Sequence, residues 1–191
     1  MGVTLRRLRP EDKDRLLAWR NSPEVAPYMY SDHVISGPEH EAWFAALEGD
    51  PRRAYWIIEL NGSPVGLVNL YDIDERNGRA AWAYYLANPA VRGQGVGAQI
   101  EFAMLDHVFI ARGLNKLWCE VLAENEAVWK LHLSFGFKEE ARLRAHVTKG
   151  GLARDVVGLG LLAEDWKRVR PDCEARLKLR RSGDLPTVPT D

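Results

Sequence analysis

A glycine-rich segment, Arg92-Gly93-Gln94-Gly95-Val96-Gly97, holds the residues whose types and spacing could most directly do chemistry. It lies between a strand-like run and an amphipathic helical pattern. Glycine removes side chains where backbone N–H groups converge, and the free N–H groups and dipole at the start of the following helix favour an anion. We therefore predict that this loop binds the pyrophosphate of a nucleotide-like cofactor.

Two other interpretations of the glycine segment are open at this point. The first is an ordinary tight turn, which a Gly-x-Gly spacing alone does not exclude. The second is a dinucleotide-binding loop, which requires G-x-G-x-x-G and an acidic residue on a following strand of a parallel βαβ unit. The segment has neither the third glycine spacing nor that setting, so a dinucleotide site is disfavoured.

An acidic residue and a cysteine stand next to each other in the apolar run KLWCEVL (116–122). Strand alternation places Glu120 on the face of Trp118 and Leu122, where partial burial would raise its pKa toward the range useful to a general base. The alternative is an edge-strand carboxylate that faces solvent or pairs with Arg or Lys. Cys119 points to the opposite face, where we expect a small core residue rather than an acyl acceptor.

These residues need elements to position them, and the first part of the chain predicts one strand and two helices. Residues 3–8 form a strand-like run, and Pro10 with the acids that follow it favours a helix start. Two prolines interrupt the pattern between 19 and 33, which predicts a loop or a broken helix. A second helix is expected from about residue 36, ending near Gly49.

Strand patterns and helical patterns then alternate along the chain. Asn-Gly pairs separate the first three of these strands, which predicts an antiparallel meander. The glycine segment leads into an amphipathic helix that stops at Gly113, and a further helix is expected over 125–135. The predicted strands cover 54–60, 63–73, 79–87, 116–122, 139–148 and 153–162.

Length and composition favour one domain. A chain of 191 residues with 46% hydrophobic residues can bury a full core and still carry a cleft. We place that domain at 1–170 and a C-terminal extension at 171–191. The extension is expected to be disordered after about residue 180, because it becomes polar there and contains Gly183, Pro186 and Pro189.

Charge and cysteine usage exclude several classes of protein. Lys and Arg total 26 against 27 for Asp and Glu, so there is no overall electrostatic drive toward nucleic acid or an anionic membrane. Cys119 and Cys173 show neither metal-ligand spacing nor a disulfide framework, which suits a reducing compartment. No signal-like or membrane-spanning apolar run occurs. We expect a cytoplasmic protein with no nucleic-acid or membrane partner.

Two segments together resemble the Gcn5-related N-acetyltransferase (GNAT) superfamily: ANPAVRGQGVG (87–97) and NEAVWKLHLSFGF (125–137). The resemblance covers roughly residues 3–165. It implies an α/β fold, with a mixed, mostly antiparallel central sheet that splays at the acetyl-CoA site and is flanked by helices. It also implies acetyl-CoA as the co-substrate, no metal, and direct transfer of the acetyl group to an amine within a ternary complex.

The same resemblance assigns the cofactor-binding residues. Splayed strands leave backbone groups unpaired, and unpaired backbone needs a partner such as the amide-rich pantetheine arm. Backbone groups around Leu86, Ala87 and Asn88 are implied to bind that arm, with Asn125 facing it. The pyrophosphate is assigned to Arg92, Gly93, Gln94, Gly95, Val96 and Gly97.

His132 stands where many members of the superfamily have a tyrosine that protonates the CoA sulfur, and related branches use histidine there. An imidazolium can act as an acid near neutral pH, so the implied catalytic residues are His132 as acid and Glu120 as base, acting through water on the acceptor ammonium. The alternative for His132 is a helix-packing role.

The acceptor is suggested by a second resemblance, carried by WRNSPEVAPYMYSDHVISGPEHEAWF (19–44), LVNLYDID (67–74) and AAWAYYL (80–86). These segments resemble the N-acetyltransferases of pseudaminic acid biosynthesis, which acetylate the 4-amine of a UDP-linked amino-dideoxy sugar. The resemblance implies that Arg20 pairs with phosphate and that aromatic rings and a thioether cover the uracil or the sugar. The implied nucleotide-sugar residues are Arg20, Asn21, Met29, Tyr30 and Tyr84.

Several alternatives stay open for the acceptor side. Core or loop packing is the alternative for each of those side chains. A peptide N-terminus of the ribosomal-protein type and a small amine that is detoxified by acetylation are the competing acceptors. A noncatalytic acetyl-CoA-binding module is a third interpretation, which the complete glycine loop and the candidate acid disfavour. A homodimer is compatible with the sequence but is not indicated by it.

Overall fold

The computed structural model describes residues 2–180 and 185–189 of the chain. The strands are β1 (Val3–Arg7), β2 (Ala54–Leu60), β3 (Ser63–Asp74), β4 (Arg79–Leu86), β5 (Lys116–Leu122), β6 (Lys138–Lys149) and β7 (Leu152–Leu162). The α-helices are α1 (Lys13–Arg20), α2 (Gly37–Ala45), α3 (Val96–Asp106), α4 (Glu126–Ser134) and α5 (Ala163–Arg180). Short 3₁₀ turns lie at Pro10–Asp12, Ala26–Tyr28 and Pro89–Val91, and a π-helical turn, His107–Ala111, continues α3.

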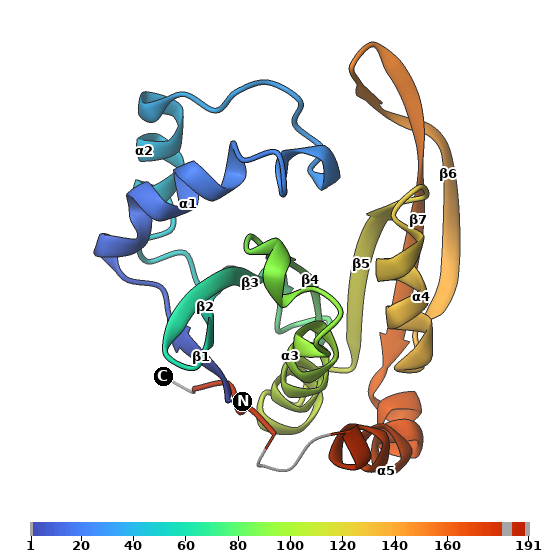
Figure 1. Ribbon diagram of the computed structural model, residues 1–191. Helices are drawn as coiled ribbons and strands as arrows, with labels where there is room; N and C mark the ends of the chain where they lie inside the picture. The colour runs from blue at the N-terminus through green and yellow to red at the C-terminus, as the bar shows by residue number, and fades with distance from the viewer. Residues whose placement is uncertain (1, 181–184, 190–191) are drawn as a thin grey trace.

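All seven strands form one sheet in the order β1-β2-β3-β4-β5-β7-β6. Every neighbouring pair is antiparallel except β4 and β5, which are parallel. Helices flank this sheet (Figure 1). The predicted fold class, a mixed and mostly antiparallel sheet with flanking helices, is therefore confirmed.

The parallel contact between β4 and β5 is short. It consists of three residue pairs, Arg79 with Lys116, Ala80 with Leu117 and Ala81 with Trp118. Beyond them β4 stays paired with β3 and β5 stays paired with β7, so the two strands diverge while each keeps its outer partner. Figure 1 shows this divergence between the β1–β4 half and the β5–β7–β6 half of the sheet.

Helices cover both faces of the sheet because both faces of its strands are apolar. In β2, Trp56 and Ile58 belong to the main core cluster, whereas Ile57 between them belongs to a second cluster with Leu16 of α1. Successive side chains of a strand point to opposite faces, so each face needs a cover. In Figure 1, α1 and α2 lie above β2–β4 and α3 lies below them.

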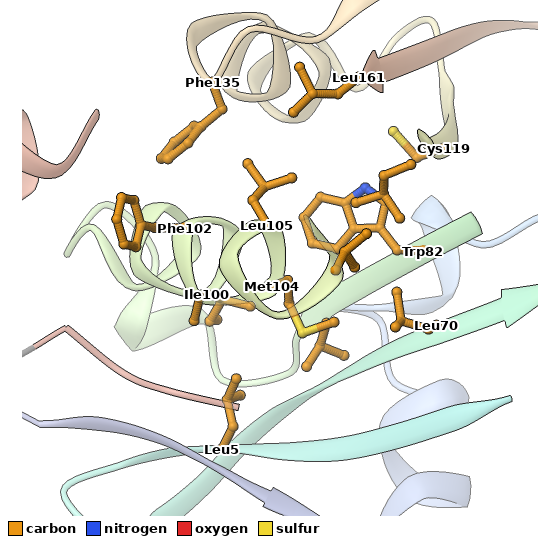
Figure 2. Packing of buried hydrophobic residues seen from close by; sticks show 14 of the residues in the cluster. Leu5, Leu70, Trp82, Ile100, Phe102, Met104, Leu105, Cys119, Phe135 and Leu161 are labelled. Carbon is orange, nitrogen blue, oxygen red and sulfur yellow. The ribbon is translucent and has the colours of Figure 1, made fainter. Parts of the chain in front are cut away.

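Helix α3 runs through the centre of the main core. Ile100, Met104 and Leu105 are fully buried, and Phe102 packs edge-to-face on Trp166 of α5 with ring centroids 5.4 Å apart. Figure 2 shows these α3 side chains pointing in several directions from the helix toward neighbouring elements. A helix that is apolar on nearly every side must be a core helix, and this fixes the position of its N-terminus beside the split sheet.

The C-terminal part of the chain belongs to the same domain. Helix α5 runs continuously across the predicted boundary between 170 and 171, and its Cys173 and Leu177 are buried in the main core. Leu185 and Val188 also pack against that core. The predicted disorder after about residue 180 otherwise falls on residues 181–184, 190 and 191, which lie outside the described part of the chain.

Two helix ends differ from the predictions. Helix α2 ends at Ala45 instead of near Gly49, because the backbone N–H of Ala46 bonds both Ala42 and Phe44 and tightens the last turn. The α-helical part of α3 ends at Asp106, and the π turn carries the chain on to Gly113, where φ is +66°.

The tip of the β6–β7 hairpin holds the loop between α1 and α2. Lys149 Nζ donates to the backbone carbonyls of Ala26, Met29 and Ser31 at 3.1, 2.5 and 3.2 Å. The backbone N–H of Gly150 donates to the Asp32 carboxylate at 2.9 Å. We call these four hydrogen bonds the clasp. Because the hairpin and the loop come from opposite halves of the sheet, the clasp bridges the split.

Candidate active site

A cavity of about 540 Å³ lies in the split between β4 and β5. Its walls come from the unpaired part of β4, from Cys119 to Leu122 of β5, from the glycine loop with the start of α3, from α4, and from the loop after α1. The site residues predicted from the sequence that line it are His132, Glu120, Leu86, Arg92, Gly93, Gly95, Val96, Gly97, Asn125, Met29, Tyr30 and Tyr84. The cavity thus brings together most of the predicted donor and acceptor residues.

The glycine loop has the geometry of an anion site. Gly93 and Gly95 both have φ of +74°, in the left-handed region, and Gly95 is the N-cap of α3. The first N–H groups of a helix have no intrahelical partner, and here they open on the cavity with the positive end of the helix dipole. At Gly97 an added Cβ would lie 3.0 Å from the Tyr84 hydroxyl. The loop therefore depends on glycine both for its backbone conformation and for space.

The remaining polar groups of the loop are used to hold it in place. Arg92 donates to the carbonyl of Glu24 at 2.7 Å and lies over the Tyr28 ring. Gln94 donates from its side chain to the carbonyl of Ala90 at 2.7 Å. Direct contact of the Arg92 and Gln94 side chains with a pyrophosphate stays a prediction, whereas the backbone geometry around them already suits one.

The diverging strands offer backbone groups to a ligand, and Leu86 borders that opening. The two residues after it are partly committed, because the N–H groups of Ala87 and Asn88 both bond the carbonyl of Val65, at 2.8 and 3.4 Å. On the far wall, Asn125 caps α4 without a side-chain hydrogen bond within the described residues. Its amide is therefore available to a ligand, as the pantetheine assignment requires.

His132 is buried and paired with an acid that the sequence prediction did not include. Its Nδ1 lies 2.9 Å from Glu101 Oε1 of α3, and the two side chains are 3% and 0% exposed. Burial opposes the charged imidazolium, but Glu101 and a hydrogen bond with Cys119 outweigh it and raise the pKa of His132 to about 10. A pKa raised this far favours the protonated ring at neutral pH. Glu101 stands out in the sequence only as an acid within an otherwise apolar helical run.

Glu120 is half-buried and faces the loop after α1. Its Oε2 accepts a hydrogen bond of 2.7 Å from the Tyr30 hydroxyl. Burial, followed by this carboxylate, raises the pKa of Tyr30 above its ordinary value, so the phenol stays a donor. Burial and the nearby Cys119 and Glu120 likewise raise the pKa of Tyr71 to about 12. A carboxylate among phenol rings is an environment suited to an ammonium group.

The two tyrosines at the end of β4 lie on opposite faces. Tyr84 stacks on Trp82 with centroids 5.5 Å apart and faces α3 and α4, the side of the glycine loop. Tyr85 packs edge-on against Trp19 of α1, and its buried hydroxyl has no hydrogen-bond partner within the described residues. Both tyrosines line the cavity, so a contact of Tyr84 with the acceptor stays a prediction, and Tyr85 is a lining residue that the sequence prediction did not include.

Arg20 and Asn21 hold the loop that follows α1. The Arg20 guanidinium contacts Met29 Sδ at 2.8 Å and the Ser31 hydroxyl at 3.2 Å. The Asn21 side chain both donates to and accepts from the backbone of Ile35, at 2.9 Å in each case. Neither residue lines the cavity, so a direct contact of either with an acceptor stays a prediction.

The described residues show neither a metal site nor a membrane-spanning helix. They contain no group of three or more His, Cys, Asp and Glu side chains arranged to hold a metal ion. Within residues 2–180 and 185–189, no helix combines the length and apolar character needed to span a membrane.

Comparisons with known proteins agree with this geometry. Residues 3–138 match the family described as Acetyltransferase (GNAT) domain. The chain is 28% identical over 169 residues to the uncharacterized N-acetyltransferase p20 of Bacillus licheniformis, covering 86% of this chain and 94% of that protein. It is 24% identical to spermidine N(1)-acetyltransferase of Escherichia coli K12, covering 86% and 88% of the two chains.

Among solved structures, spermidine N-acetyltransferase from Vibrio cholerae in complex with CoA and spermine superposes with a TM-score of 0.80. The sequence identity is 23%, and the alignment covers 86% of this chain and 98% of that one, so this likeness supports the fold. The glycine loop at the start of α3, the split between β4 and β5 and the family match together show that this chain belongs to the GNAT family, as an N-acetyltransferase that uses acetyl-CoA as its donor.

Proposed function

We propose that this enzyme transfers the acetyl group directly to the primary amine of a small cationic molecule, an aliphatic amine such as a polyamine. The proposal is carried by the Glu120 carboxylate, which stands at the split and is held there by Tyr30. The acetyl donor approaches from the side of α3 and α4, and the amine approaches from the side of α1 and α2. The two meet through the split, so no protein nucleophile is required.

The chain's own residues supply the chemistry of this transfer. Acetyl-CoA provides an activated thioester, and the unpaired edges of β4 and β5 with the glycine loop fit its arm and pyrophosphate. Glu120 binds the ammonium and accepts its proton through water, which leaves the neutral amine that can attack. His132, which is protonated at neutral pH, donates a proton to the departing sulfur.

The nucleotide-sugar acceptor suggested by the N-terminal sequence is the second candidate. Met29 and Tyr30 line the cavity as that interpretation requires. A diphosphate, however, needs available cations, and three cations near this opening already make hydrogen bonds within the protein. Arg20 is bonded to Met29 and Ser31, Arg92 to a backbone carbonyl, and Lys149 to three carbonyls of the loop. The similarity of this chain to spermidine acetyltransferases also favours a small cationic amine.

The test is acetyl-CoA-dependent thiol release with three acceptors in parallel: spermidine, a UDP-linked 4-amino-dideoxy sugar and a set of peptides with free N-termini. We expect turnover with the polyamine. Replacing Glu120 with Gln should raise the KM for the amine by about tenfold or more, since a hydrogen bond to a charged group is worth about 1.5–3 kcal/mol.

Glu124→Gln is the matched control, because Glu124 is an exposed acid close by in sequence that pairs with Arg154 and does not line the cavity. It should leave the KM for the amine unchanged. Turnover confined to the nucleotide sugar or to the peptides would replace the proposed acceptor while leaving the donor site intact.

A further inference from the structure

Glu101 is a carboxylate in the centre of the apolar core, between Ile100 and Phe102 of α3. It is 0% exposed, and its Oε1 contacts His132 Nδ1 at 2.9 Å. Its Oε2 has no hydrogen-bond partner among the described residues. Burying a carboxylate costs several kcal/mol unless a partner compensates, and replacing such a pair by apolar residues is often neutral or stabilising. The position of Glu101 therefore calls for a role beyond packing.

The surroundings of His132 leave one route for its proton. Glu101 of α3 occupies Nδ1, and Cys119 of β5 shares a hydrogen bond with the ring. Tyr84 of β4 packs edge-on against it, with centroids 6.3 Å apart. Cys173 of α5 is the other titratable group near Glu101, and burial raises the pKa of that thiol. Cys119, Tyr84 and His132 all line the cavity, and Glu101 already contacts Nδ1, which leaves Nε2 as the ring nitrogen that can release a proton there.

We propose that Glu101 is a positioning residue for acetyl transfer, holding His132 by Nδ1 so that Nε2–H stands at the base of the split as the proton donor. This inference rests on the proposed function. As the amine forms the new C–N bond, the C–S bond breaks and its electron pair goes to sulfur. His132 Nε2 releases its proton to that sulfur, and the ring becomes neutral. Glu120 first passes the ammonium proton on to water, so that it can then accept, through water, the proton that the amine loses as the C–N bond forms. A proton from solvent restores the His132 imidazolium.

Charge balance explains why a carboxylate is needed at 101. A buried imidazolium is costly to desolvate, and only a negative partner offsets that cost. A glutamine at this position could keep a hydrogen bond to Nδ1, but it could not balance the charge. Glu101 can therefore act in two separable ways, by orienting the His132 ring and by balancing its charge. The pH dependence of turnover distinguishes the two.

The first experiment compares wild type with Glu101→Gln by measuring kcat and KM across pH. The wild-type kcat should fall on the alkaline side near pH 10, where the imidazolium is lost. In Glu101→Gln, burial is no longer opposed by the carboxylate, so this limb should move toward neutral pH. At neutral pH, kcat should drop by about 100-fold, within the usual contribution of a general acid, while the KM for acetyl-CoA changes little.

Two variants control for a merely structural effect. Asp106→Asn makes the same carboxylate-to-amide change on the same helix, at a residue that bonds Trp166 and Arg170, and should leave the pH profile in place. Glu101→Asp keeps the charge and should keep the alkaline limb where wild type has it. An unchanged limb in Glu101→Gln, or the same shift in Asp106→Asn, would overturn the proposal.

A measurement without turnover keeps the inference separate from the proposed function. The ring nitrogens of His132 can be titrated by NMR in the wild-type protein with no acetyl-CoA present. The ring should remain protonated well above neutral pH, and a midpoint near the ordinary value of 6.5 would overturn the proposal even if Glu101→Gln failed to fold. A wild type that acetylates no amine would remove the proposed acceptor chemistry without touching this titration.

A last experiment tests whether Cys119 is acetylated. Intact-mass measurement after incubation with acetyl-CoA alone should show unmodified protein, because His132 serves the departing sulfur and not a protein nucleophile. One added acetyl group that disappears in Cys119→Ala would mean that His132 and Glu101 instead activate Cys119, as the base and its orienting partner do in enzymes with a nucleophilic cysteine, and would overturn the proposal.

Discussion

The contact between α3 and α4 places charge where the protein is otherwise apolar. The His132 ring packs against Trp82, Tyr84 and Phe137, and the side chains of His132 and Glu101 are both almost fully buried. The folded-state pKa of His132, about 10, lies above its value of about 6.5 in an unfolded chain. The protonated imidazole therefore stabilises the folded state fully below about pH 6.5, and this contribution is lost as the pH rises toward 10.

Stability should accordingly fall between neutral pH and pH 10, and more steeply in wild type than in His132→Gln. The difference should be on the order of a few kcal/mol, since one pKa unit corresponds to about 1.4 kcal/mol. Denaturant unfolding at a series of pH values measures it. Other groups that titrate in this range are common to both proteins, so parallel pH curves for the two would contradict a raised pKa of His132 in the folded state.

The sequence predicts the positions of some site residues but not of others. Alternation along β5 correctly separates Glu120 from Cys119, because period two is a local property. Tyr84 and Tyr85 are adjacent, and which of them faces the acceptor depends on the register of β4 between its neighbours. Glu101 acquires its partner from a helix 31 residues away along the chain. Such contacts arise from tertiary packing, so no local pattern could reveal them.

At the scale of elements, the glycine loop and the start of α3 form the donor site that we propose. Gly95 and Gly113 stand at opposite ends of the α3 segment, and both have left-handed φ, +74° and +66°. We expect Gly95→Asp to abolish acetyl-CoA binding, because its carboxylate would repel the pyrophosphate at the helix N-terminus. Gly113→Asp introduces the same charge and comparable backbone strain, about 1–2 kcal/mol, far from the loop.

Isothermal titration of acetyl-CoA into both variants measures this prediction. Gly113→Asp should bind with wild-type affinity. Equal loss of affinity in the two variants would mean that strain in α3, rather than charge at the loop, disrupts binding, and unchanged affinity in Gly95→Asp would remove the loop from the donor site.

The sequence predicts the order of the strands and of most helices. It does not predict the length of the β4–β5 contact or the helix α5. The six strands expected after residue 50 all form, with ends within about two residues of the prediction, because alternation and turn residues are local signals. The length of the β4–β5 contact is not local, since three pairs or seven would suit the same sequence pattern. Helix α5 carries many charges and has Pro171 in its interior, which hides it from a local pattern.

The whole molecule consists of two sheet halves joined at β4 and β5 by three residue pairs. Across the opening, the halves are also connected by the Tyr30–Glu120 hydrogen bond and by the clasp. The proposed donor site is built mainly on the core around α3, whereas the proposed acceptor side is built on the loop that the clasp holds. Weakening the clasp should therefore affect the two substrates unequally.

We expect Lys149→Met to raise the KM for the amine acceptor by about tenfold, since three hydrogen bonds from one charged group are lost, with acetyl-CoA affinity within about twofold of wild type. Lys178→Met is the control, because Lys178 is an exposed lysine of α5 paired with Glu174. Steady-state kinetics and donor titration measure both. Equal weakening of donor and acceptor binding would show that the clasp supports the whole fold and not the acceptor side.

The short contact between β4 and β5 also bears on which acyl donors the enzyme can use. The split is open at the glycine loop and closed at Ala81 and Trp118, where backbone pairing resumes. Just inside that end stand the Trp82 indole and the Cys119 thiol, both buried. We expect a two-carbon acyl group to fit in front of these side chains and each further methylene to displace them. Turnover should therefore fall from acetyl-CoA to propionyl-CoA to butyryl-CoA, and equal turnover with the three donors would contradict a limit set by the last strand pair.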